Sequence, residues 1–203
     1  MILQMLFGKK TVLSTRFRSV FVASLLSMVS AYLLMLTDNV VAGQLAGRDA
    51  VMGMTLIFPL VTFILFVSYI ISDGLVILLS YAQGKGDRLE VDHLFSMGIL
   101  LSALVGAAFM FSMFIFRDEI LGFWNISPQL LSYAGDYYNG LLFYAPLMLL
   151  NVFFYTVFVA EGMERVCVIG AGCTFIVNVI LDIVLCNVLG IMGVGIASSC
   201  GIL

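Results

Sequence analysis

Long apolar runs separated by short polar segments dominate the pattern of this chain. An α-helix needs about 20 mostly apolar residues to cross the roughly 30 Å hydrocarbon core of a bilayer. Five runs reach that length, and a sixth begins close to the last residue. The predicted spans are residues 19–41, 51–82, 94–116, 131–159 and 167–188, with a partial span at 194–203. The pattern predicts an all-α, polytopic membrane helical bundle of five full helices and the start of a sixth.

The composition supports a lipid environment. Hydrophobic residues make up 63% of the chain and charged residues 10%, whereas soluble domains have about 45–50% and about 25%. The lipid bilayer is therefore the first expected partner. A net charge of −3 provides no basic surface for nucleic acid. The four cysteines have no CxxC spacing, so we expect no metal centre built from them.

The basic residues predict the orientation. With the N-terminus inside, the outer loops carry Arg48 and Arg117, and the other seven of the nine Lys and Arg residues lie on the cytosolic side. These seven are Lys9, Lys10, Arg16, Arg18, Lys85, Arg88 and Arg165. The positive-inside rule then predicts a cytosolic lead-in at 1–18 and an N-terminal transmembrane bundle at 19–203, in the inner or plasma membrane.

Carboxylates at membrane depth are the first candidates for function, because each is costly there unless it is paired or hydrated. Thr174, Asn178 and Asp182 repeat every four residues and so share one face of the fifth span. Asp38 lies at a similar distance from the basic cytosolic end of its own span. Two acids at one depth predict a coupled site that takes up H⁺ or Na⁺. Alternatively, each acid lies at a helix end in water.

Two other acids have weaker arguments. Asp73 precedes Gly74 in the second span and either lines a cavity or marks a kink. We take Asp73 and Thr174 as candidates for a substrate cavity. Asp136 occurs in YAGDYYNG, near the outer start of the fourth span. We interpret this segment as an exposed acid within an aromatic belt formed by Tyr133, Tyr137 and Tyr138.

Several segments resemble the multidrug and toxic compound extrusion (MATE) family of efflux transporters. The resemblance covers about residues 18–203. FVAEG resembles the exit of the family's fourth helix, although the usual arginine is absent. The other matching segments are TDNVVAGQLAG at 37–47, LLSYAQGKGDR at 78–88, NVILDIVL at 178–185 and GIMGVGIASS at 190–199. The last two, an Asn-x-x-x-Asp helix and a glycine-rich entry to the sixth helix, are the most specific.

The resemblance implies a twelve-helix transporter with two similar bundles of six. It implies export of cationic aromatic small molecules in exchange for H⁺ or Na⁺, with no enzyme activity and no cofactor beyond the coupling ion. By the same resemblance, Asp38, Asn178 and Asp182 form the cation site of the N-terminal lobe. The chain stops where the family's sixth helix begins. We therefore expect a truncated N-terminal half that lacks the C-terminal six-helix lobe and is inactive alone.

The sequence leaves three alternative functions to consider. A lipid-linked oligosaccharide flippase of the same superfamily usually has basic residues in its lumen, whereas no Lys or Arg occurs in the predicted spans. An intramembrane aspartyl protease needs two acids in contact, but its Tyr-Asp motif is absent and the Gly-x-Gly-Asp at 84–87 lies in a polar loop outside the predicted spans. A non-transporting membrane assembly fragment is the third.

Overall fold

The computed structural model describes residues 12–202, and in this part the chain is helical and contains no strand. Five of its helices are long and apolar enough to cross a membrane. These five are α2 (Val12–Leu45), α3 (Arg48–Lys85), α4 (Arg88–Ile115), α7 (Tyr144–Glu161) and α8 (Glu164–Leu189). The shorter helices are α5 (Arg117–Gly122), α6 (Pro128–Gly140) and α9 (Ile191–Cys200). The predicted all-α membrane bundle is confirmed.

The helices extend beyond the predicted spans at several ends. Helix α2 begins within the predicted lead-in, and the rest of that lead-in, residues 1–11, lies outside the described residues. Helix α3 has 38 residues, or about 57 Å at 1.5 Å per residue, against a hydrocarbon core of roughly 30 Å. Hydropathy marks the stretch that lipid covers, whereas backbone hydrogen bonds continue a helix into its polar ends.

The predicted fourth span is not one continuous helix. Helix α6 ends at Gly140 and α7 begins at Tyr144, with turns at residues 141–143 between them. Pro146 lies in the first turn of α7, where its missing N–H would have no helical partner in any case. Because the same proline could not donate to Leu142, a continuous helix through this point would lose a hydrogen bond. The break avoids that loss.

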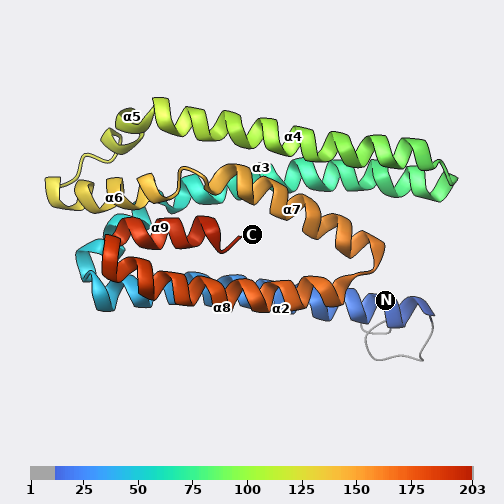
Figure 1. Ribbon diagram of the computed structural model, residues 1–203, viewed down its shortest axis with the longest axis horizontal. Helices are drawn as coiled ribbons and strands as arrows, with labels where there is room; N and C mark the ends of the chain where they lie inside the picture. Colours follow the sequence, from blue (N-terminus) through green and yellow to red (C-terminus); the bar gives the residue numbers. More distant parts are fainter. Residues whose placement is uncertain (1–11, 203) are drawn as a thin grey trace.

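Chain reversals alternate between the two ends of the bundle. The start of α2 and the α3–α4 and α7–α8 turns lie at one end, and the α2–α3 and α8–α9 turns lie at the other (Figure 1). Helix α2 packs along α8, whereas α3 packs with α4, α6 and α7. Helix α9 contacts both α8 and α6 and so connects the two groups (Figure 1).

Helix α4 approaches α7 through small residues. A Cβ atom on Gly98 would lie 2.2 Å from the ring of Phe153, and one on Gly106 would lie 2.4 Å from Cα of Pro146. Ser102, one turn from each glycine, is fully buried. Small residues four apart allow close helix packing in a membrane, where lipid provides no hydrophobic drive between helices. By contrast, many large apolar side chains face outward, as lipid contact requires.

Gly86 ends α3 in the left-handed conformation, with φ +74°. A side chain there costs about 1–2 kcal/mol, so we expect Gly86→Ala to destabilise the chain in detergent. Gly84, two residues earlier and inside the helix, has open space around its Cα. Gly84→Ala is the matched control, because alanine favours helix, and its thermal unfolding temperature should equal or exceed that of the unmodified chain. Equal stability of the two variants would contradict the capping role.

Candidate functional site

The structure places Asp38 of α2 beside Asp182 of α8. Both are buried, with exposed fractions of 8% and 0%. Their carboxyl groups are close enough to share a hydrogen bond once one of them carries a proton. Two acids separated by more than 140 residues in sequence therefore lie side by side in the structure.

Helix α9 encloses the α8 side of this acid pair. Asn178 lies one turn before Asp182 on α8 and is 1% exposed. A Cβ atom on Gly201 would lie 2.9 Å from the side-chain nitrogen of Asn178, and one on Gly193 would lie 2.2 Å from the Leu185 carbonyl oxygen. Glycines thus bring the α9 segment directly onto α8, and this close approach keeps lipid away from the polar face.

Hydroxyl groups from three other elements surround Asp38. Ser198 of α9 has its Oγ 3.1 Å from Oδ2 of Asp38 and can donate to it. The phenol of Tyr137, on α6, lies near Ser198 and both acids. Tyr144, at the start of α7, also lies near Asp38. The break between α6 and α7 therefore lies next to the acid pair.

The acid pair has few partners. Oδ1 of Asp38, both carboxyl oxygens of Asp182 and both polar side-chain atoms of Asn178 have no hydrogen-bond partner within residues 12–202. In the same part of the chain, no Lys, Arg or His side chain pairs with either acid. Two buried like charges without a counter-ion are unfavourable. The arrangement is therefore suited to hold one monovalent cation.

The free atoms of the site set the kind of cation it can accept. Carboxylate and amide oxygens are hard donors that suit Na⁺ as well as a proton. Among the described residues, no group of three or more His, Cys, Asp or Glu side chains could hold a metal ion. The oxygen donors of the pair therefore suit a small, hard cation better than a soft transition metal.

The two candidates for a substrate cavity lie apart from this pair. Asp73 is exposed on α3, and Thr174 is half-buried on α8, two turns before Asp182. Within the described chain, no hydrogen bond or ion pair connects either residue to the acids. An exposed carboxylate inside a membrane span must face water or protein, because lipid cannot solvate it.

Sequence reasoning missed Ser198 and both site tyrosines. The interpretation of Tyr137 and Tyr138 as part of an interface belt was wrong, since these residues are 3% and 0% exposed. The Tyr138 hydroxyl donates instead to the carbonyl oxygen of Met113, near the end of α4, at 2.7 Å. Asp136 in the same segment is exposed, as expected. A four-residue spacing between buried Tyr137 and buried Leu141 was the available signal of an inward face.

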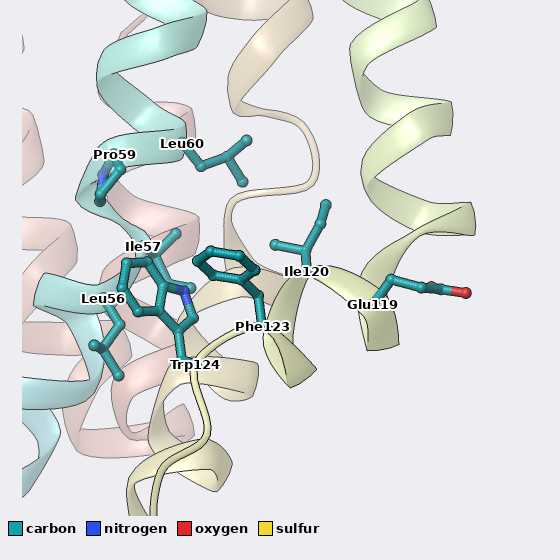
Figure 2. Close-up of a pocket in the computed structure, with 8 residues that line it drawn as sticks. All are labelled: Leu56, Ile57, Pro59, Leu60, Glu119, Ile120, Phe123 and Trp124. Atoms are coloured by element: carbon teal, nitrogen blue, oxygen red, sulfur yellow. The ribbon is translucent and has the colours of Figure 1, made fainter.

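A separate hollow of about 330 Å³ opens between α3 and the segment around α5 (Figure 2). Leu56, Ile57, Pro59 and Leu60 line it on the α3 side, facing the rings of Phe123 and Trp124. The side chain of Glu119 points away from those rings (Figure 2). The hollow shares no residue with the acid pair. Its apolar lining fits contact with lipid near the end of the bundle that carries the α2–α3 and α8–α9 turns (Figure 1).

Comparisons with known proteins agree on the fold. A family model described as MatE matches residues 23–184. The chain is 18% identical, with a TM-score of 0.84, to an outward-facing multidrug resistance MATE family transporter of the MOP superfamily. It is also 18% identical, with a TM-score of 0.83, to a MOP superfamily transporter from Pyrococcus furiosus Vc1 whose binding pocket has reverse polarity.

The match in each case covers 92% of this chain. The chain spans only 42% of the length of those two structures. A third similar structure, MATE in complex with MaD3S, has a TM-score of 0.83 with 18% identity and the same coverage of both chains. A search of curated proteins found no match.

Proposed function

This chain belongs to the MatE family, and from that premise we propose that it forms one helical lobe of a transporter that exports cationic compounds in exchange for H⁺ or Na⁺. Members of this family are transporters and not enzymes. The observation that carries the proposal is the buried contact between Asp38 and Asp182, which no Lys, Arg or His side chain of the described residues joins. Contact between two acids also meets one requirement of an aspartyl protease, but family membership favours transport.

The coupling step follows from the charge of the site. When it is empty, the pair holds two carboxylates with few hydrogen bonds. One proton or one Na⁺ removes most of their repulsion, and the Asn178 side chain supplies a neutral oxygen. Occupied and empty sites therefore favour different packing of α2 against α8 and α9. This difference in helix packing would couple binding of the small cation to release of the cationic cargo.

One structure with this fold is described by the reverse polarity of its binding pocket, so pocket charge differs within the fold. We therefore infer the cargo of this chain from the charges of its own spans. No Lys or Arg occurs within the predicted spans of this chain. On α3, Tyr69 and Asp73 lie one turn apart, and both are exposed. Tyr155 of α7 lies near Tyr69. A carboxylate with two phenol rings suits an aromatic cation, whereas a polyanionic lipid headgroup would be repelled.

Transport needs a second helical bundle, since alternating access moves one bundle against another around a central site. We propose that this lobe works with a C-terminal lobe of six helices, in the inner or plasma membrane and with its N-terminus in the cytosol. The cytosolic end would then be the end with the α3–α4 and α7–α8 turns, which carry Lys85, Arg88 and Arg165.

Reconstitution tests this function. In proteoliposomes, a two-lobed protein that contains this chain is expected to drive efflux of a cationic dye when a proton or Na⁺ gradient is imposed. The 203-residue chain alone is expected to show no sustained efflux, because it has no partner bundle. Gradient-independent leakage from the two-lobed protein would contradict coupling. Sustained gradient-driven efflux by the chain alone would contradict the need for a second lobe.

A further inference from the structure

A hydroxyl of α9 reaches the break between α6 and α7. The last carbonyl groups of a helix have no donor within it. Ser199, which is 2% exposed, lies with its Oγ 3.0 Å from the carbonyl oxygen of Gly140, the last residue of α6. Ser199 therefore satisfies a backbone group that the break leaves free.

The preceding residue, Ser198, reaches the acid pair through its hydrogen bond to Asp38. Successive residues of a helix point about 100° apart, so two adjacent serines can reach two different neighbours. One short segment of α9 thus touches Asp38 on one side and the helix break on the other. Figure 1 shows α9 in this intermediate place, between α8 and α6.

Each of these serines has one acceptor on a neighbouring element and one on its own helix within reach. Ser198 lies 3.1 Å from the Asp38 carboxylate and 3.0 Å from the carbonyl oxygen of Val194. Ser199 lies 3.0 Å from the Gly140 carbonyl and 3.0 Å from the carbonyl of Gly195. A hydroxyl has one proton to donate. Each serine therefore either bonds across to a neighbouring element or back to its own helix.

The charge on Asp38 decides between the two arrangements of Ser198. A hydrogen bond to a carboxylate is about twice as strong as one to a neutral acceptor. Loss of that charge therefore favours the bond back to Val194. The titratable groups that face Asp38 are Asp182, Tyr137 and Tyr144, from α8, α6 and α7. Both tyrosines flank the break.

Helix α9 is in direct backbone contact with the last turn of α6. A Cβ atom on Gly195 would lie 2.6 Å from the Tyr137 carbonyl oxygen, and one on Gly140 would lie 2.4 Å from the Met192 carbonyl oxygen. Such direct backbone contact transmits a small shift of α9 to the end of α6.

We propose that Ser199 is a positioning residue that couples the α6–α7 break to the charge state of the acid pair, with α9 as the connecting element. The inference rests on the proposed function, in which a cation neutralises the pair. With Asp38 charged, both serines bond across, and the break is held. With that charge removed, Ser198 bonds back to Val194, α9 relaxes, and Ser199 releases the Gly140 carbonyl.

Hydrogen–deuterium exchange of peptides covering residues 137–148, with the chain in lipid nanodiscs, tests the coupling. Asp38→Asn removes the charge and is expected to speed exchange about two- to tenfold, the range for loss of one hydrogen bond. Ser199→Ala is expected to do the same. The double variant should exchange no faster than Ser199→Ala alone, because both changes act through the same bond. Multiplied effects, or no effect of Asp38→Asn, would overturn the proposal.

Ser102→Ala is the matched control. Ser102 is a fully buried serine of α4 whose hydroxyl has no hydrogen-bond partner among the described residues, so its loss should leave exchange at 137–148 unchanged. If Ser199→Ala does not fold, Ser199→Cys replaces the hydroxyl with a slightly larger and weaker donor, and it should also speed exchange. Unchanged exchange in Ser199→Cys would overturn the proposal.

Efflux measured on the same substitutions separates this inference from the proposed function. Loss of efflux in Asp38→Asn with unchanged exchange would overturn only the link through Ser199 and would leave the proposed function standing. Faster exchange in Asp38→Asn with normal efflux would support the link and overturn the transport role of the acid pair.

Discussion

Asp182→Asn is expected to abolish gradient-driven efflux by the two-lobed protein while leaving its expression and stability intact. The substitution keeps the shape of a fully buried side chain but removes one of the two charges on which the proposed cation coupling depends. Efflux should fall to the level of empty liposomes. Asp38→Asn should have the same effect, since among residues 12–202 no Lys, Arg or His side chain pairs with either acid.

The stability of the Asp182→Asn variant should stay the same or increase, although its efflux is lost. Removing one of two adjacent buried carboxylates relieves their repulsion, and replacing unfavourably buried charges is often neutral or stabilising. The thermal unfolding temperature of Asp182→Asn in detergent is therefore expected to equal or exceed that of the unmodified protein. A large loss of stability would mean that the pair is structural.

Asp136→Asn is the matched control for the acid pair. Asp136 is an exposed acid of α6, the helix that also carries the site residue Tyr137. Its replacement removes the same charge without touching the pair, so dye efflux should remain within about twofold of normal. Normal efflux in Asp182→Asn, or equal losses in Asp136→Asn and Asp182→Asn, would remove the basis for the proposed coupling.

The acid pair could be predicted from sequence because the surrounding residues are so apolar. In a soluble helix, Asn178 and Asp182 would be two ordinary surface residues. Between Ile and Val neighbours at membrane depth, a polar residue is costly unless it faces protein or water. The four-residue spacing of Asn178 and Asp182 places both on one face of the helix. Asp38 could be matched in depth because both helices run in the same direction from basic ends.

The remaining site residues could not be predicted in the same way. Ser198 and Ser199 are small and occur in helices both as packing residues and as donors, so their type does not reveal which neighbour they touch. Tyrosine is equally ambiguous, because it suits both a membrane interface and a buried hydrogen bond. Pro146 does indicate an interruption of the fourth span, but the turn lies upstream at 141–143, where no residue type marks it.

Close backbone contact is a second feature that the sequence does not reveal, and Gly140 tests it. We expect Gly140→Ala to destabilise the chain and to separate α6 from α9. The added Cβ atom would lie 2.4 Å from the Met192 carbonyl oxygen, 2.8 Å from the Ile196 nitrogen and 2.9 Å from Cα of Gly195. All three are backbone atoms, so no side-chain rotation relieves the overlap.

The comparison with Gly170→Ala isolates that contact. Gly170 is exposed on α8 with no heavy atom within 4 Å of a built Cβ, and alanine favours helix over glycine by about 1 kcal/mol. Overpacking at Gly140 costs about 1–3 kcal/mol or more. Thermal unfolding of the two variants in detergent should therefore shift in opposite directions.

Because the Gly140 carbonyl is also the acceptor for Ser199, Gly140→Ala should in addition speed amide exchange across residues 137–148. A variant at Gly140 as stable as the one at Gly170 would show that α6 and α9 are not in backbone contact, and the connection between the acid pair and the helix break would then lack its mechanical basis.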